Sequence, residues 1–353
     1  MSVDLIVVGG GVIGLSAAFL AARGGLSVRV VEAAVPGNTG ATSVAAGMLA
    51  PLAEAHDMPE DLVRVGIQSA RAYPGFIEAV KAYGGDTGFN DQGTLIVAAD
   101  RDQAGDLEQL GRAHQRLGLE VEKLTVREVI RREPRVSPRI AGGLWCPEDH
   151  SVPPPVLCGA LVRGIEALGG SVCRGFSGQA VQADPLGVRV RTPDGSEEVW
   201  RGARVLVAAG LGSQAVLGDL VDLGMRPVKG QVLHLRGERL LRGVVRTPRV
   251  YLVPRADRLV IGASEEELGD HAEPLAGVTM DLLYEAWRTL PGVYELELER
   301  ILVGHRPSTR DGRPVVGPVG PDGLFVATGH HRHGILLAPW TAYTLAEMWG
   351  LQA

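Results

Sequence analysis

The chain has 353 residues, of which 45% are hydrophobic and 22% are charged, with three cysteines and a formal net charge of −6. That length allows two domains with a substantial core, and the composition is ordinary for a globular protein. The negative balance gives no reason to expect nucleic acid or an anionic membrane as a partner, and the spacing of the cysteines argues against a disulfide framework or a zinc site and favours a reducing compartment.

The first predicted unit is a strand, a glycine turn and a helix. Leu5–Val8 is a short apolar run typical of a buried parallel strand, and it leads into Gly9-x-Gly11-x-x-Gly14 and a helix of small residues. The first glycine permits a tight turn, the second lets backbone N–H groups approach a pyrophosphate, and the third allows close packing of helix and strand. A second apolar strand ends in Glu32, at the spacing of an acid that binds an adenosine ribose. This unit predicts a dinucleotide site that favours FAD or NAD over NADP.

The apolar stretch 5–22 has the alternative interpretation of a signal peptide or a membrane span. It lacks a basic region before it, follows Asp4, and is interrupted by four glycines that already have a role. We therefore expect the first βα unit of a cytoplasmic protein.

The next part of the chain predicts helices and one strand pair. The small and hydroxyl-bearing residues of 38–43 indicate either a loop that lines a cofactor or a flexible connection. Thr125 and Glu128 have the spacing of a capping box at the start of a helix. Prolines and glycines in 134–155 favour a crossing between domains. The predicted elements are a helix over 60–83, a strand pair over 89–98 around Gly93, and helices over 102–117, 125–133 and 156–168.

The second half predicts more strands than helices. Pro193-Asp194-Gly195 is typical of a hairpin turn, and the strand that ends at Gly210 suits the far side of a doubly wound sheet. The predicted elements are strands over 171–173, 179–183, 188–192, 197–201 and 204–209, an antiparallel meander over 228–235, 250–254 and 258–263, a helix over 279–290, strands over 298–304 and 323–329, and a last helix over 333–349.

Four motifs, spread over nearly the whole chain, together resemble a known family. They are Val7–Gly14, Ala45–Leu49, Tyr251–Arg255, and the C-terminal pair Gly304–Pro314 with Gly329–Pro339. The first is shared by many flavoproteins, but the combination is similar to the FAD-dependent D-amino acid oxidase superfamily, and within it to the glycine oxidases of thiamine biosynthesis. The resemblance implies FAD rather than NAD as the cofactor, and a homo-oligomer.

The resemblance also implies an α/β fold of two domains. The first is a Rossmann-like FAD-binding domain of the D-amino acid oxidase type, assembled from residues 1–84, 142–222 and 302–353. The second is an α+β substrate domain built on an antiparallel sheet, from residues 85–141 and 223–301.

The expected cofactor contacts lie in the glycine turn, at the end of the second strand, in the segment before residue 49, and in a C-terminal loop along the flavin ring. A helix that begins at His333-Gly334 would direct its positive end toward the negative charge of the reduced flavin. These residues are Gly9, Gly11, Val12, Ile13, Gly14, Glu32, Ala33, Ala41, Thr42, Ser43, Ala46, Gly47, Met48, Gly178 (by its backbone), His330, His331, Arg332, His333, Gly334, Ile335 and Leu336.

The resemblance assigns the substrate carboxylate to Arg306, helped by the hydroxyl of Tyr251, with Arg332 as a second active-site arginine. A planar guanidinium matches a carboxylate, which makes arginine a natural clamp. The substrate, with its amine neutral, would transfer a hydride from its α-carbon to flavin N5 and leave an imine, so that catalysis is orientation and electrostatics. Adjacent histidines such as His330 and His331 rarely converge on one ion, and we expect no metal.

The expected function is FAD-dependent oxidative deamination of glycine and small amines such as sarcosine or small D-amino acids. O2 would reoxidise the flavin and give H2O2, and the imine would supply thiazole synthesis in thiamine formation. Departures from the glycine oxidase pattern at Arg249, His333 and Ser264–Glu266 leave the exact substrate open. The alternatives are a D-amino acid or sarcosine oxidase or dehydrogenase with another electron acceptor, and a flavin-binding scaffold, against which the joint presence of Arg306 and Tyr251 argues.

Overall fold

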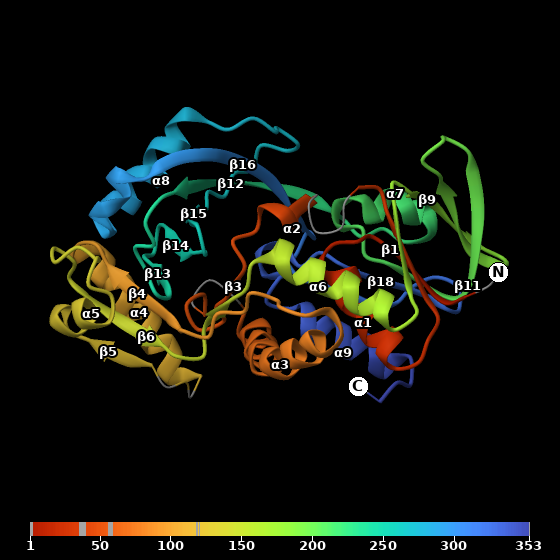
Figure 1. Ribbon diagram of the computed structural model, residues 1–353, viewed down its shortest axis with the longest axis horizontal. Coiled ribbons are helices and arrows are strands. Elements are labelled where there is room, and N and C mark those ends of the chain that lie inside the picture. Colours follow the sequence, from red (N-terminus) through yellow and green to blue (C-terminus); the bar gives the residue numbers. More distant parts are fainter. Residues whose placement is uncertain (1–2, 35–39, 56–58, 118, 120, 353) are drawn as a thin grey trace.

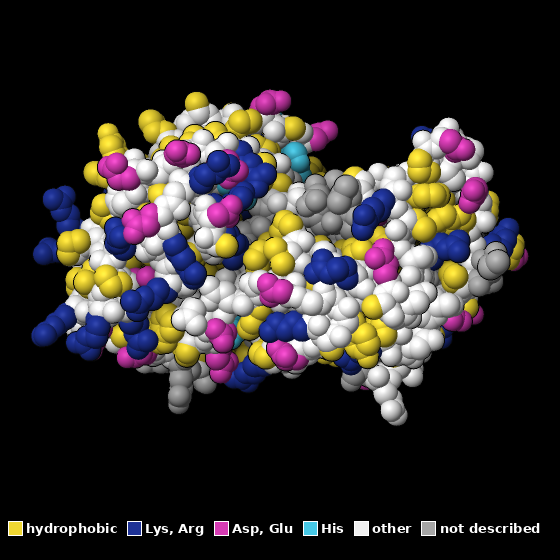
Figure 2. Space-filling view, in the orientation of Figure 1, with side chains coloured by type: hydrophobic (Ala, Val, Ile, Leu, Met, Phe, Trp, Pro, Cys, Tyr) yellow, Lys and Arg dark blue, Asp and Glu magenta, His cyan; other side chains and the backbone are white. Residues whose placement is uncertain are grey.

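The computed structural model describes residues 3–34, 40–55, 59–117, 119 and 121–352, and part of the expected loop at 38–43 lies outside these residues. Two eight-stranded sheets lie side by side along the long axis of the molecule (Figure 1). On the face seen in Figure 2, Lys and Arg side chains gather mostly over the part that contains the second sheet, with Asp and Glu side chains among them. Among the described residues, no helix has the length and apolarity needed to cross a membrane.

The first sheet is parallel at its centre, because its central strands are buried apolar runs joined by crossovers. β1 (Val3–Val8) pairs in parallel with β2 (Val28–Glu32) on one side and with β11 (Glu197–Val207) on the other. β8 (Ser171–Arg174) and β18 (Leu324–Thr328) extend the two sides in parallel. This strand order is the doubly wound arrangement that the sequence predicts.

Helices cover one face of the first sheet and a hairpin covers the other. The helices are α1 (Val12–Arg23), α3 (Glu60–Gly84), α6 (Pro154–Ala167) and α9 (Ala338–Met348), which pack together (Figure 1). On the opposite face lie β9 (Ser177–Ala183), β10 (Leu186–Arg191) and the short helix α7 (Ser213–Leu217). The hairpin turn at 193–195 is confirmed, but the two strands predicted after it form one strand, β11, which turns from the hairpin into the parallel sheet.

The second sheet is built on two long antiparallel strands, β12 (Arg226–Arg236) and β16 (Glu297–Ser308). Its strand order is β16, β12, β15 (Arg258–Gly262), β14 (Tyr251–Pro254), β13 (Val244–Arg246), β4 (Thr94–Ala98), β6 (Gly142–Cys146) and β5 (Glu122–Leu124). The helices beside it are α8 (Ala276–Thr289), α4 (Arg101–Arg116) and α5 (Val126–Arg132). The capping box of Thr125 and Glu128 at α5 is confirmed.

Two predictions about the second sheet are wrong. The strand pair around Gly93 is a single strand, β4, because Gly93 (φ 72°) forms a turn that packs against Trp145 and not the tip of a hairpin. The meander is not in chain order, since β15 lies between β12 and β14, and the unpredicted strand β13 pairs in parallel with β4.

The domain boundaries stay a prediction, and sheet membership differs from them at two places. β6 belongs to the second sheet although it follows the expected boundary at residue 142. β16 crosses the expected boundary at residue 302 and stays in the second sheet up to Ser308. β16 is therefore the strand that carries the second sheet toward the first, and it ends beside the C-terminal loop through the bridge Ser308–His330.

Candidate active site

A cavity of about 640 Å³ lies between the two sheets and is lined by both. Its size is in the usual range for a ligand site. The lining contains nearly all the residues expected from the sequence: Gly9, Gly11, Val12, Ile13, Glu32, Ala33, Ala41, Thr42, Ala46, Gly47, Met48, Gly178, Tyr251, Arg306 and 330–336. Gly14 and Ser43 are not part of the lining, and the Ser43 hydroxyl instead donates to the carbonyl of Gly40 in the short helix α2 (Gly40–Val44).

The glycine turn has the shape that a dinucleotide phosphate requires. A Cβ on Gly9 (φ 115°) would lie 2.4 Å from the carbonyl oxygen of Ala208, and a Cβ on Gly14 would lie 2.0 Å from that of Gly9. Only glycine therefore lets β1, α1 and β11 approach as they do, and the N-terminus of α1 faces the cavity. Glu32 accepts hydrogen bonds from the N–H groups of Gly10 (2.6 Å) and Ala34 (3.0 Å) at the rim of this turn. The cradle fits the diphosphate and ribose of FAD.

A half-buried arginine that the sequence analysis gave no role holds the segment before residue 49. Arg255 donates from Nη2 to the carbonyls of Ala46 and Val152, and burial lowers the pKa of its guanidinium to about 10. Gly47 (φ 77°) passes so close to Val152 that a Cβ would lie 1.8 Å from its carbonyl oxygen. Arg255 thus fixes a cavity wall from β14, and its place in the Tyr251–Arg255 motif was the available signal.

The expected helix start at His333-Gly334 is wrong. His331–His333 form one 3-10 turn, and α9 begins at Ala338, with Pro339 in its first turn, where proline is favoured. The loop between them is held by α3, because Tyr73 Oη and Ser69 Oγ donate to the carbonyls of Ile335 (2.5 Å) and Leu336 (2.6 Å). Residues 330–336 line the cavity, and their position along the flavin ring stays a prediction. The N-terminus of an α-helix does not lie at His333-Gly334, so it cannot supply the positive dipole that was expected there.

Arg306 reaches into the cavity from β16 and is oriented by backbone carbonyls. Its Nη1 donates to the carbonyl of Lys229 (3.1 Å) and its Nη2 to that of Ser264 (2.9 Å). A Cβ on Gly230 would lie 2.7 Å from Arg306 Nη1, so glycine makes room for the guanidinium. Among the residues that the structure describes, no carboxylate forms an ion pair with Arg306. Its charge is thus available to a ligand.

Tyr251 lies on β14, next to the part of the cavity that contains Arg306. A Cβ on Gly262 would lie 2.6 Å from its hydroxyl, so a second glycine makes room at this wall. Burial raises the pKa of Tyr251 to about 12, against the opposing effect of Arg306, and the hydroxyl keeps its proton at neutral pH. Arg306 and Tyr251 line the same cavity, close enough for the charge of the guanidinium to act on the hydroxyl.

A buried ion cluster centred on Glu54 forms another part of the lining. Glu54 pairs with Arg246 Nη1 (2.8 Å), Arg332 Nη2 (3.4 Å) and His333 Nδ1 (3.3 Å). Burial would raise the pKa of Glu54, but Arg332, His333 and Arg246 together hold it well below its usual value. Sequence reasoning missed Glu54 and Arg246, which belong to no motif and are far apart in the chain. Arg332 is thus bound to a protein carboxylate as well as facing the cavity.

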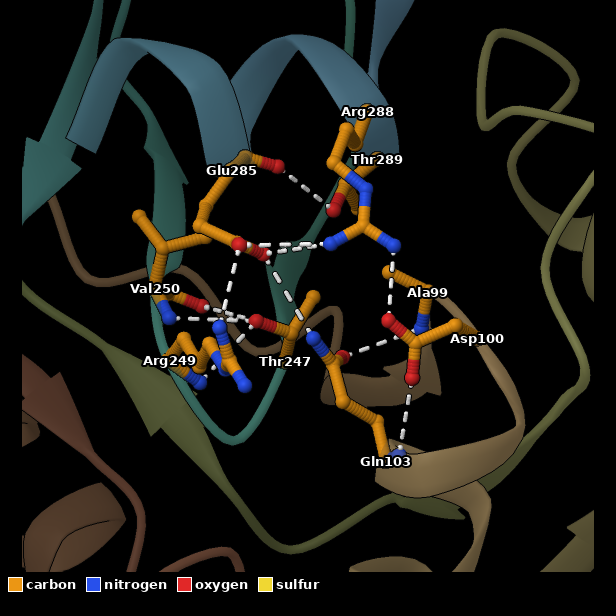
Figure 3. A network of polar contacts seen from close by, with 9 residues as sticks. All are labelled: Ala99, Asp100, Gln103, Thr247, Arg249, Val250, Glu285, Arg288 and Thr289. Carbon is orange, nitrogen blue, oxygen red and sulfur yellow. Dashed lines mark hydrogen bonds and ion pairs between the residues drawn. The ribbon is translucent and has the colours of Figure 1, made fainter. Parts of the chain in front are cut away.

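Arg249, one of the departures from the family pattern, lines the cavity and takes part in a second polar network (Figure 3). Its Nη1 lies 3.5 Å from Glu285 Oε1 on α8. Arg288 holds Glu285 (3.2 Å) and reaches Asp100 at the start of α4 (2.7 Å). The network joins this wall of the cavity to two outer helices.

The doubly wound sheet and the glycine cradle are typical of a protein that binds a dinucleotide such as FAD, and in the same cavity Arg306 forms no ion pair with a carboxylate of the described residues. The family model described as FAD dependent oxidoreductase (DAO) matches residues 4–348. Glycine oxidase from Bacillus licheniformis is 32% identical over 351 residues, which cover 98% of this chain and 92% of that protein. The chain belongs to the DAO family of FAD-dependent oxidoreductases, and its cofactor is FAD.

Solved structures agree with this assignment. The crystal structure of glycine oxidase from Geobacillus kaustophilus aligns with a TM-score of 0.89 and 30% identity, over 100% of this chain and 96% of that one. A more distant relative by sequence is the hydrogen cyanide synthase subunit HcnC of Pseudomonas aeruginosa, which is 29% identical over 98% of this chain and 92% of that protein. These similarities support FAD-dependent oxidation of an amine.

Proposed function

We propose that the protein oxidises glycine and small amines such as sarcosine or small D-amino acids, using O2 as electron acceptor. The products would be an imine and H2O2, and the imine would feed thiazole synthesis in thiamine formation. The proposal includes a cytoplasmic location and a homo-oligomer. The observation that carries it is Arg306, which forms no ion pair with any described carboxylate and lies in the same cavity as the glycine cradle.

The chain's own residues would bind and orient the substrate. Arg306 and the Tyr251 hydroxyl would hold the carboxylate, because both line the same cavity and both donate hydrogen bonds of the kind that a carboxylate accepts. The chemistry that FAD supplies when bound is acceptance of a hydride at N5 and return of two electrons to oxygen. Gly230 leaves room for the guanidinium of Arg306 and Gly262 leaves room for the ring of Tyr251, so both proposed donors fit at the cavity wall.

The direct test is the visible spectrum of the purified holoenzyme during anaerobic addition of glycine, followed by air. Bleaching of the flavin by glycine, and its recovery in air with release of H2O2, would support the substrate and the acceptor together. A flavin that glycine leaves oxidised but sarcosine or D-alanine bleaches would favour the neighbouring substrates. A flavin that is bleached but recovers slowly in air would favour a dehydrogenase with another acceptor.

The substitution Arg306→Ala separates an oxidase from a scaffold. We expect the apparent affinity for glycine to fall by a factor of about 100 or more, because a desolvated, hydrogen-bonded charge pair is lost. Arg310→Ala is the matched control, since Arg310 lies four residues away, is exposed, and pairs with Asp222 outside the cavity. If turnover of Arg306→Ala equals that of Arg310→Ala, the clamp is assigned to the wrong residue.

A further inference from the structure

Next to the arginine clamp, the cavity contains two hydrogen-bond acceptors that the proposed chemistry has not used. They are Nε2 of His331 and the carboxylate of Glu265, and both residues line the cavity. His331 Nε2 is buried and, among the described residues, has no hydrogen-bond partner. Its distance to Glu265 Oε1 is 3.9 Å, too long for a hydrogen bond between them.

The spacing of these two atoms suits a single bridging nitrogen. An ammonium or amine nitrogen that donates two hydrogen bonds of about 2.8 Å, at an angle between right and tetrahedral, joins acceptors that lie about 4 to 4.6 Å apart. The 3.9 Å gap is close to the lower end of that range. A buried ring nitrogen without a partner is costly unless a ligand satisfies it.

The imidazole is suited to accept rather than donate. Burial lowers the pKa of His331 to about 4, with Glu265 opposing the shift and Arg306, His333 and Arg332 adding to it. The ring is therefore neutral at neutral pH, and a proton on Nδ1 leaves the lone pair on Nε2. His331 is also the one non-glycine residue with a left-handed backbone (φ 50°) in the part of the chain that is described. Such conformations gather at ligand sites, where the surroundings hold them.

The pair lies close to the clamp in the same cavity. The bridge between Ser308 and His330 joins β16, which carries Arg306, to the turn that carries His331. Arg306 and His331 are close enough that the charge of the guanidinium lowers the pKa of the imidazole. In an α-amino acid the nitrogen is two bonds from the carboxylate carbon. A carboxylate on Arg306 thus brings the amine to the neighbouring wall.

We propose that His331 and Glu265 form an amine-binding pair, which accepts hydrogen bonds from the substrate nitrogen while Arg306 and Tyr251 hold the carboxylate. This inference rests on the proposed function and deepens it, because it assigns the site to zwitterionic α-amino acids with a nitrogen that carries at least two hydrogens. The other carboxylate oxygen of Glu265, Oε2, lies 3.6 Å from Arg332 Nη1, and this ion pair helps to position the carboxylate.

The test compares a ligand that has an amine with one that lacks it. Glycine affinity comes from the concentration dependence of anaerobic flavin reduction in the holoenzyme, and acetate affinity from the change it causes in the flavin spectrum. For His331→Phe and for Glu265→Gln we expect glycine to bind about tenfold more weakly, the size of a lost charge-assisted hydrogen bond. Acetate should bind within about twofold of its wild-type affinity in His331→Phe, and equally or more tightly in Glu265→Gln, since a nearby negative charge is removed.

Two further variants exclude a general structural effect. His331→Gln keeps an acceptor and should recover most of the glycine affinity. Glu267→Gln makes the same chemical change two residues from Glu265 at an exposed carboxylate that pairs with Arg226 outside the cavity, and should bind glycine like the wild type.

The outcomes separate the inference from the proposed function. Equal losses for glycine and acetate, or no loss of glycine affinity, would overturn the amine-binding pair while the wild type is still reduced by glycine. A wild-type flavin that glycine, sarcosine and D-alanine all leave oxidised would overturn both.

Discussion

At the scale of single residues, the ion cluster around Glu54 is the part of the cavity with the largest energetic consequence. Its carboxylate is buried and lies within ion-pair distance of Arg246, Arg332 and His333. Removing one partner of a buried pair is costly because the other charge stays buried without compensation. The cluster therefore links the stability of the protein to the position of Arg332.

We expect Glu54→Gln to lower the free energy of unfolding by about 3 to 5 kcal/mol, since Arg246 would be left buried without a carboxylate. Urea unfolding of the holoenzyme measures this change. Glu78→Gln, at an exposed pair with Lys81, is the control and should change the same quantity by less than about 1 kcal/mol. Equal losses in the two variants would show that Arg246 finds compensation elsewhere.

The residues that the sequence predicts and those it misses differ in a physical way. Arg306 and Tyr251 lie in the motifs through which the chain resembles a known family, and both line the cavity, although their roles stay a proposal. Glu54 and Arg246 are common residue types that acquire meaning only when folding brings two distant segments together. No local sequence pattern predicts this ion pair between distant segments.

At the scale of elements, the contact of β1 with α1 depends on Gly14, which faces the strand and not the cavity. A methyl group there would lie 2.0 Å from the carbonyl oxygen of Gly9, so α1 would have to move away from the turn that binds the phosphates. We expect Gly14→Ala to be purified with less than about a tenth of the wild-type FAD content, because of the steric demand at this contact. The ratio of flavin to protein absorbance measures it.

Gly75→Ala is the matched control for this substitution. Gly75 is exposed within α3, and an added Cβ there meets nothing within 4 Å. Since alanine favours helix over glycine, this variant should keep its FAD and gain about 0.5 to 1 kcal/mol of stability. Retention of FAD by Gly14→Ala would mean that α1 adjusts without disturbing the turn.

Elements were predicted well where their signals are local. The helix α3 and the capping box of α5 follow from periodicity and from two side chains three residues apart. The strand order of the second sheet could not be predicted from local signals. β13 pairs with β4, about 150 residues away, and β15 is inserted between β12 and β14. Register between distant strands is a property of the packed sheet and not of either strand alone.

At the scale of the whole molecule, buried titratable groups give stability an optimum in pH. Burial lowers the pKa of His234 to about 4, of His330 to about 3 and of His331 to about 4, from an ordinary value of 6.5. The unfolded chain therefore binds more protons than the folded one below pH 6.5, and these groups make stability rise with pH up to that value.

Asp149 has the opposite effect. Burial, supported by the nearby Glu54, raises its pKa from 3.8 to about 8, so the folded chain binds one more proton than the unfolded chain between these values. Its contribution falls as pH rises through that window. Below pH 6.5 the three histidines change the free energy of unfolding more steeply with pH than Asp149 does, so stability rises with pH. Above pH 6.5, of these four groups only Asp149 still changes stability, and stability falls.

We therefore expect the free energy of unfolding to be largest near pH 6.5 and to fall by about 1.4 kcal/mol per pH unit up to pH 8. Urea unfolding over pH 5 to 9, each in the same ionic strength, measures the curve. Asp149→Asn should flatten the limb above pH 6.5 and leave the acid limb in place. A wild-type curve that still rises at pH 8 would show that Asp149 is ionised in the folded protein.

The cavity is lined by both sheets, so the cofactor and the substrate would share one space and the cofactor would form part of the substrate-binding site. Arg306 and Tyr251 belong to the second sheet, the glycine turn belongs to the first, and among the described residues both line the same cavity. With FAD bound, its isoalloxazine ring would form one wall of the space that receives the amino acid, and we expect the flavin to bind before the substrate. We expect acetate to raise the melting temperature of the holoenzyme but not of the flavin-free protein, because a ligand stabilises only the state that binds it. Equal shifts in both would mean that the clamp is complete without the flavin.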